Sequence, residues 1–318
     1  SSHELNQPGC YRDVTDTTVV AQFKITGEGS NALAKELADG HTYFLAWTTT
    51  PWTLPSNTAL TVGKKIDYVL VETYNQYTFE PVKVILAKAL VGKQFSGKFY
   101  EVGGDTAGVN TEPSRSAKAD LDTYTSSDKK IPYLVTREFK GVDLLELRYE
   151  QLFDFVQPHD NPQDAFRVIA GDFVTTEDGT GIVHTAPTFG ADDALVAKQV
   201  SPEIPPLLIK DENDNLVPLV DLQGKFRPEL KEFGNKYIKN EYYTDGEAPE
   251  RSMDVELAIR LKEENKAFKV EKYVHSYPHC WRTDKPVLYY PLDSWFIKVT
   301  DFKDRMHELN LGINWKPK

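Results

Sequence analysis

Short runs of β-branched and aromatic residues recur along most of this chain, and turn-forming residues separate them. Val, Ile, Thr, Tyr and Phe suit a pleated, half-buried strand, whereas Gly, Pro and Asn interrupt one. The predicted strands are residues 18–26, 41–47, 58–62, 68–72, 82–86, 133–135 and 166–174. Strands that alternate regularly with helices, as in a doubly wound sheet, are not apparent. The sequence therefore predicts a mainly β domain with helices, built as a closed β-barrel-like fold.

Helices are predicted at few positions. The clearest covers residues 252–268, where apolar residues recur at helical spacing and Ser252 can act as the N-cap. Residues 207–220 are predicted to form a hairpin that turns at 212–215, and residues 175–183 two short strands joined by an Asp-Gly turn. The other predicted helices are residues 31–39, 87–94 and 192–200.

The domain organisation follows from shifts in composition. Residues 1–17 are polar and are predicted to form an arm leading into a β-barrel domain of residues 18–250. Within that domain, residues 103–130 are rich in Gly, Ser, Thr, Asp and Lys and nearly lack large apolar residues, which predicts a flexible insertion. Residues 251–318 are predicted to be a helix followed by an exit segment.

Charge and cysteine content exclude several classes of function. The formal net charge is −11, which argues against broad, salt-dependent nucleic-acid binding but allows a local contact with one nucleic-acid end. No apolar run reaches the length of a membrane span, and no secretory signal pattern is present. Cys10 and Cys280 lie far apart, so a disulfide framework is not expected. The sequence therefore predicts a cytoplasmic protein without a membrane segment.

Three consecutive threonines follow the predicted strand 41–47. Alternation along a strand sends Thr48 and Thr50 to one side and Thr49 to the other, and Pro51 then ends regular pairing. Threonine is a good strand former, and that alone explains a run of three. At a strand end, hydroxyl groups can also position a water molecule or hold a ribose or carbonyl oxygen.

A second polar segment places His184 at the end of a strand and Asp192-Asp193 at the start of a helix. Aspartate at a helix N-terminus is ordinarily a cap, which is the interpretation preferred for Asp192. A lone histidine is more often a hydrogen-bonded structural residue than a ligand. Because no cysteine or second histidine lies at ligand spacing from these residues, neither a metal site nor a cofactor is predicted.

Four strings combine these features along the chain: WTTTPWTLPSN (47–57), FKGVDLL (139–145), GTGIVHTAPTFGADD (179–193) and YPHCWR (277–282). Together, and in this order, they resemble the editing domain of isoleucyl-tRNA synthetase, a class I aminoacyl-tRNA synthetase. The resemblance covers nearly all of the chain. It implies a barrel-like editing domain inserted into a larger enzyme.

The resemblance also implies catalytic residues. Asp193 would hold the α-ammonium of the substrate by a charge-assisted hydrogen bond in a partly dry pocket. Thr48, Thr49 and Thr50 would shape the pocket and orient water or ribose.

The substrate-binding residues implied by the resemblance are Trp52, Thr53, Asn57 and His184, together with Asp193. Trp52 and His184 would set the size of the pocket, and Asn57 would organise the loop after the threonines. In this family, itself a standard example of the double sieve, the pocket admits valine and excludes isoleucine, which is one methylene larger.

The implied function is hydrolysis of the ester of mischarged valyl-tRNA(Ile), with valyl-adenylate as a further candidate substrate. No G-x-S-x-G string and no cysteine beside a base is present, so direct attack by water is predicted. The ATP signatures H-x-G-H and K-M-S-K-S are also absent. The predicted partners are the valine-carrying acceptor end of tRNA(Ile) and the rest of the synthetase chain, and the chain itself is predicted to be a monomer.

Two alternatives stay open. The first is the same chemistry in the valyl or leucyl branch, where the family pattern has Arg before the proline and Glu or Asp after it. Here Thr50 precedes Pro51 and Trp52 follows it, which favours the isoleucyl branch. The second is a non-catalytic module that only binds the acceptor end.

Overall fold

The computed structural model describes residues 5–102, 115–292, 295, 297–314 and 316. Within them lie thirteen strands, one α-helix longer than nine residues and several shorter helical turns. The strands are β1 Tyr11–Thr26, β2 Thr42–Thr48, β3 Ala59–Val62, β4 Asp67–Tyr74, β5 Pro81–Ala87, β6 Phe99–Glu101, β7 Ile131–Lys140, β8 Arg148–Tyr149, β9 Arg167–Ala170, β10 Ile182–Thr185, β11 Leu208–Lys210, β12 Leu216–Pro218 and β13 Ala267–Pro278.

The helices are short and decorate the sheet. The α-helices are α2 Ala34–Leu37, α3 Val91–Gln94, α4 Arg115–Asp122, α5 Ala191–Gln199, α6 Met253–Glu263 and α7 Lys303–Leu311. The 3₁₀ helices are η1 Pro51–Ser56, η2 Lys88–Leu90, η3 Gly141–Leu144, η4 Pro162–Asp164, η5 Pro228–Phe233, η6 Asn240–Tyr242 and η7 Val299–Asp301. In the described part of the chain, no helix has the length and apolar composition needed to cross a membrane.

Six strands form a closed circuit of pairs. β1 pairs with β2 and with β8, β8 with β9, β9 with β3, β3 with β10, and β10 again with β2. A circuit of this kind leaves no free edge among its members. Beyond it, β5, β4, β7 and β6 extend the sheet from β2, and β13 pairs with β1 on the other side. The predicted mainly β fold with helices is confirmed.

Two hydrophobic cores lie on opposite faces of the sheet, because successive side chains of a strand point to opposite faces. In β2, Phe44 and Ala46 belong to the larger core, whereas Tyr43 and Leu45 belong to the second. The strand is therefore apolar at consecutive positions, as is usual where both faces are covered. Because both faces of β2 are packed against a core, the orientation of this strand and of the residues at its end is fixed.

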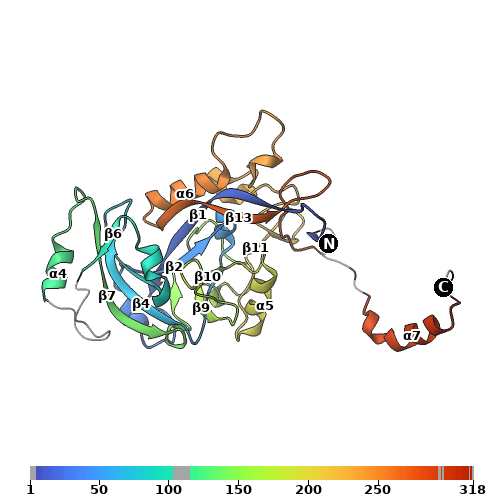
Figure 1. The fold of residues 1–318 in the computed structure, drawn as a ribbon, viewed down its shortest axis with the longest axis horizontal. Helices are drawn as coiled ribbons and strands as arrows, with labels where there is room; N and C mark the ends of the chain where they lie inside the picture. The colour runs from blue at the N-terminus through green and yellow to red at the C-terminus, as the bar shows by residue number, and fades with distance from the viewer. Residues whose placement is uncertain (1–4, 103–114, 293–294, 296, 315, 317–318) are drawn as a thin grey trace.

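Figure 1 shows the long β1–β13 ribbon running across the domain with α6 lying over it. α6 contacts β1, β13 and η1. α7 lies well away from the body of the domain, and all of its residues are exposed. The assignment of residues 251–318 as a helix followed by an exit segment stays a prediction.

Several predicted elements differ from the structure. The helix predicted over residues 252–268 ends at Glu263, because Asn265 has a φ of 56° and β13 begins at Ala267. Ser252 is its N-cap residue, but the side chain makes no capping hydrogen bond. Of the two strands predicted in residues 175–183, the structure contains only the second, β10, which begins at Ile182.

The arm and the insertion are only partly described. β1 begins at Tyr11, inside the predicted arm of residues 1–17, because it pairs with β13 from that residue onward. Of the predicted insertion, residues 103–114 lie outside the described residues, and α4 occupies Arg115–Asp122. The domain boundaries and the flexibility of the insertion stay predictions.

Candidate functional site

A cavity of about 270 Å³ lies where β2 and β10 end. Six of the eight residues predicted for the site contribute to its wall, although they come from parts of the chain more than 130 positions apart. Its lining residues are Trp47, Thr48, Thr49, Thr50, Thr53, Val183, His184, Ala186, Phe189, Gly190 and Asp193. The fold therefore brings together the two sequence segments that were singled out independently.

The threonine run bends over the cavity because β2 ends at Thr48 and η1 begins at Pro51. The Thr50 backbone N–H donates to Thr48 Oγ1 at 3.1 Å, and the two hydroxyl oxygens lie 3.3 Å apart. Thr49 also lines the cavity. All three threonines therefore line one cavity. Regular strand alternation would send Thr49 to the side opposite Thr48 and Thr50, but the strand ends at Thr48.

His184 is buried, and both of its ring nitrogens are engaged. Asn57 Nδ2 lies 2.9 Å from His184 Nδ1, and Thr53 Oγ1 lies 3.0 Å from His184 Nε2. The Thr53 hydroxyl donates to the Thr50 carbonyl at 2.8 Å, so it accepts from the imidazole. These partners place the proton on Nε2.

Burial lowers the pKa of His184 to about 4. The ring is consequently neutral near pH 7 and has no free nitrogen for proton transfer. It is held as a rigid, uncharged part of the wall. This geometry fits a residue that shapes the pocket.

Asp193 lies in the first turn of α5, whose N-cap is Gly190. Its Oδ2 accepts the Ala186 backbone N–H at 2.8 Å. Burial, and to a smaller extent the neighbouring Asp192, raises the pKa of Asp193. Among the described residues no Lys, Arg or His forms an ion pair with this carboxylate. A half-buried carboxylate with no internal cation is suited to receive a cationic ligand group.

Trp52 and Asn57 do not line the cavity. Trp52 is 3% exposed and packs edge to face against Phe189, with the ring centroids 5.1 Å apart. Asn57 is 2% exposed and lies behind His184, where Tyr149 donates its hydroxyl to Asn57 Oδ1 at 2.7 Å. Both predicted residues therefore support the wall from behind.

Sequence reasoning missed several residues of the site. Phe189 forms part of the wall, and Tyr149 orients Asn57. Phe189 is a single aromatic residue in an irregular loop, a pattern with no signal of its own. The contact between Tyr149 and Asn57 spans 92 positions, so that no local pattern could have indicated it.

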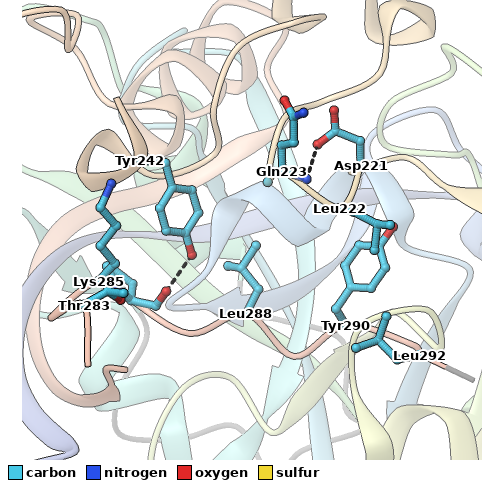
Figure 2. Close-up of a pocket in the computed structure, with 11 residues that line it drawn as sticks. Asp221, Leu222, Gln223, Tyr242, Thr283, Lys285, Leu288, Tyr290 and Leu292 are labelled. Carbon is cyan, nitrogen blue, oxygen red and sulfur yellow. Dashed lines mark hydrogen bonds between the residues drawn. The ribbon is translucent and has the colours of Figure 1, made fainter. Parts of the chain in front are cut away.

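A larger cavity of about 370 Å³ lies between Asp221, Tyr242 and Leu288 (Figure 2). Two of its polar groups are engaged within the chain: the Asp221 carboxylate accepts from the Gln223 N–H at 2.8 Å, and the Tyr242 hydroxyl donates to the Pro286 carbonyl at 2.7 Å. Ligand sites combine apolar walls with polar groups that are free to orient a ligand. The smaller cavity, which contains the Asp193 carboxylate beside several threonines, is taken as the candidate site.

A metal centre is not assembled in the part of the chain that the structure describes. No group of three or more His, Cys, Asp or Glu side chains there could hold an ion.

Comparisons with known proteins cover the whole chain. The chain is 56% identical to an isoleucine–tRNA ligase of Cytophaga hutchinsonii and 53% identical to one of Bacteroides fragilis, in each case over 100% of this chain and 27% of the relative. A ligase of the same name from Clostridium tetani is 37% identical over 100% of this chain and 23% of the relative. No family model matches.

The solved structures that match are more distant in sequence than these relatives. The crystal structure of GlLeuRS-CP1 has a TM-score of 0.46 and 15% identity over 80% of this chain and 99% of that one. The P. knowlesi cytosolic leucyl-tRNA synthetase editing domain has a TM-score of 0.37 and 12% identity over 62% of this chain and 66% of that one.

The sequence matches place the chain among the aminoacyl-tRNA synthetases. Within that class it belongs to the isoleucyl-tRNA synthetase family, which confirms the resemblance seen in the sequence. The chain spans about a quarter of the length of these relatives.

Proposed function

We propose that this chain is an editing domain that hydrolyses the ester linking valine to tRNA(Ile). The observation that carries the proposal is the Asp193 carboxylate, which shares one cavity with four threonines and has no cation partner among the described residues. An aminoacyl ester carries an α-ammonium close to its carbonyl group. The carboxylate would bind that ammonium and thereby fix the ester among the hydroxyls.

The reaction needs a water molecule aimed at the ester carbonyl. Thr48 and Thr50, whose hydroxyl oxygens lie 3.3 Å apart, would hold this water or the terminal ribose. The N-terminus of α5 adjoins the cavity at Gly190, and its positive end would favour the negative charge that develops on the carbonyl oxygen. We assign no base role to His184, because both of its ring nitrogens are engaged in hydrogen bonds within the chain.

Size selection would come from walls that cannot move. His184 is held by Asn57 and Thr53, and Phe189 is backed by Trp52. One methylene changes binding in an apolar pocket by about 1–3 kcal/mol, a range for which isoleucyl-tRNA synthetases are themselves a standard example. A rigid wall excludes the larger side chain more strictly because it cannot relax.

The test is deacylation of preformed valyl-tRNA(Ile) and isoleucyl-tRNA(Ile) by the purified chain. Wild type is expected to release valine and spare isoleucine. Asp193→Ala is expected to lower kcat/KM by about a hundredfold, because a desolvated charge partner contributes several kcal/mol. Asp192→Ala removes the same charge one residue away, where the side chain is exposed, and serves as the matched control.

Three outcomes would contradict parts of this proposal. Wild-type activity in folded Asp193→Ala would exclude the carboxylate as the ammonium partner. Hydrolysis of misacylated tRNA(Val) or misacylated tRNA(Leu) in preference to valyl-tRNA(Ile) would move the chain to another branch. Binding of a non-hydrolysable valyl-adenosine analogue without any ester hydrolysis would favour the non-catalytic acceptor-end module.

A further inference from the structure

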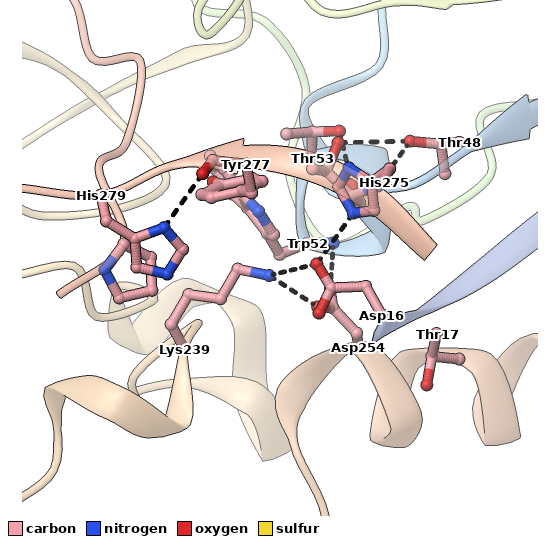
Figure 3. A network of polar contacts seen from close by, with 12 residues as sticks. Asp16, Thr17, Thr48, Trp52, Thr53, Lys239, Asp254, His275, Tyr277 and His279 are labelled. Atoms are coloured by element: carbon pink, nitrogen blue, oxygen red, sulfur yellow. Dashed lines mark hydrogen bonds and ion pairs between the residues drawn. The ribbon is translucent and has the colours of Figure 1, made fainter. Parts of the chain in front are cut away.

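A buried cluster of charges lies beside the candidate site without lining its cavity (Figure 3). Lys239 and Asp254 are 6% and 4% exposed. The ammonium of Lys239 lies 3.2 Å from Asp254 Oδ2 and 3.5 Å from Asp16 Oδ2. Burial alone would lower the pKa of Lys239, but the two carboxylates outweigh it and raise the pKa, so the ammonium stays charged. The same Asp16 oxygen lies 3.1 Å from His275 Nε2.

Asp254 also reaches the loop that carries the threonines. Its Oδ1 accepts the Trp52 backbone N–H at 3.1 Å, across 202 positions of sequence. Trp52 has the first N–H of η1, because Pro51 has none. The N-cap residue, Thr50, makes no side-chain capping hydrogen bond. Asp254 therefore supplies, from α6, the cap that η1 lacks locally.

The capped turn determines where three parts of the cavity wall lie. Thr50 precedes η1 and Thr53 lies within it, and the Thr53 N–H and hydroxyl both bind the Thr50 carbonyl. The Trp52 ring packs against Phe189. A shift of η1 by a fraction of an ångström would move hydroxyls and aromatic wall together.

We propose that Asp254, held in place by Lys239, is a positioning residue for the editing pocket: by capping η1 it sets the places of Thr50, Thr53 and the Trp52–Phe189 wall. This proposal rests on the proposed function only because ester hydrolysis is the activity used to measure it. The cap itself is a feature of the chain and can be read from ligand binding as well as from hydrolysis.

The first test is Asp254→Asn in the full chain. The amide keeps the shape of the side chain but has one oxygen. With Lys239 present, that oxygen turns to the ammonium and the amide N–H groups face the Trp52 N–H, so the cap is lost. We expect kcat for valyl-tRNA(Ile) to fall about tenfold with a smaller change in KM, as expected for a misplaced wall. Glu256→Gln, on the same helix and paired with Lys236 at 2.8 Å, is the matched control and should keep kcat.

A second substitution separates positioning from stability. In Asp254→Asn/Lys239→Met the amide oxygen no longer faces an ammonium and is free to accept the Trp52 N–H. We expect kcat to return to within about threefold of wild type. Two substitutions that merely destabilised the fold would instead lower the unfolding midpoint further without rescuing kcat in the folded protein.

Specific results would overturn the positioning role. One is a kcat for folded Asp254→Asn that equals that of Glu256→Gln. Another is the absence of rescue in the double variant. If Asp254→Asn does not fold, Asp254→Asn/Lys239→Met is compared with Asp254→Ala/Lys239→Met, since neither has the Lys239–Asp254 charge pair and only the first has an acceptor for Trp52. Equal kcat in those two would overturn the role.

Failure of the proposed function gives a different result. If wild type hydrolyses no ester, that function is wrong, and the same variants are ranked by the Kd of a non-hydrolysable valyl-adenosine analogue. Weaker binding in Asp254→Asn that is restored in the double variant supports the cap. Equal binding in all variants overturns it.

Discussion

Two ionisable side chains in the cavity are shifted toward their neutral forms by the same cause. Burial lowers the pKa of His184 to about 4 and raises that of Asp193. For His184, the hydrogen bonds to Asn57 and Thr53 use both nitrogens and leave a neutral ring. For Asp193, a bound ammonium would reverse the shift and stabilise the charged carboxylate. Ligand binding and ionisation of this residue are therefore expected to be coupled.

The buried histidine predicts a pH dependence of stability. The pKa of His184 is about 4 in the folded chain against 6.5 for the unperturbed side chain, so between these values the unfolded state binds more protons. The free energy of unfolding should therefore fall as pH falls from about 6.5 to about 4, by roughly 3 kcal/mol at most. Urea unfolding of wild type and His184→Gln across this range measures it. Equal pH slopes in the two proteins would contradict the burial of a neutral ring.

Gly190 permits the position of Asp193. A Cβ built on Gly190 would lie 2.7 Å from Asp193 Cγ and 2.8 Å from its Oδ2. Gly190→Ala should therefore displace the carboxylate and lower kcat/KM for valyl-tRNA(Ile) by about ten- to a hundredfold. Gly92→Ala is the control, because a Cβ there meets no atom within 4 Å. Unchanged kcat/KM in folded Gly190→Ala would show that the carboxylate position is not critical.

At the scale of elements, the site is built where regular structure stops. β2 ends at Thr48, η1 begins at Pro51 and β10 ends at Thr185. Strand ends of this kind present backbone and side-chain groups that are free of the sheet ladder. The groups behind the wall tie these ends together, because Tyr149 from β8 orients Asn57, and Asn57 orients His184 from β10. Rigidity of the pocket thus comes from contacts between elements.

This chain of hydrogen bonds predicts the effect of removing one hydroxyl. Tyr149→Phe leaves Asn57 Oδ1 buried without its 2.7 Å donor, which should lower the free energy of unfolding by about 1–3 kcal/mol. The control is Tyr124→Phe, since the Tyr124 hydroxyl is buried with no partner within the described structure. Its loss should be neutral or slightly stabilising. Urea unfolding of both variants tests the contrast, and equal losses would contradict it.

At the scale of the whole molecule, charge limits how the proposed RNA substrate could be held. The formal net charge is −11, so the surface as a whole repels a polyphosphate chain. Recognition would then depend on the aminoacyl end entering the cavity. The exposed α7, which lies apart from the body in Figure 1, does not contribute to the cavity wall.

This distribution predicts weak salt dependence. Binding of a non-hydrolysable valyl-tRNA(Ile) analogue should show a slope of log affinity against log salt of about −1 to −2, the value for one or two neutralised phosphates. A valyl-adenosine analogue without phosphate should give a slope near zero and serves as the control. Fluorescence anisotropy between low and moderate salt measures both. A slope steeper than about −5 for the tRNA analogue would indicate an extended phosphate-binding surface.

Much of the fold could be predicted from local pattern. Strand runs such as 41–47 and 58–62 coincide with β2 and β3 within one residue, because burial on one or both faces selects β-branched and aromatic residues. The helix over 252–268 was predicted too long, because a positive φ at Asn265 ends it and its last residues pair in β13. The spacing of apolar residues alone does not show where the chain leaves a helix and begins to pair as a strand.

The sequence by itself determined the family and the mainly β class, and it predicted Thr48 to Thr50, His184 and Asp193 as site residues, because these inferences depend on residue type and local order. Only the tertiary structure decided that Thr49 faces the cavity, that Asn57 and Trp52 stand behind its wall, and that η1 contacts Asp254. The physical reason is distance along the chain. These contacts join residues up to 202 positions apart, and their partners are selected by how the strands close and by which buried polar groups must be paired.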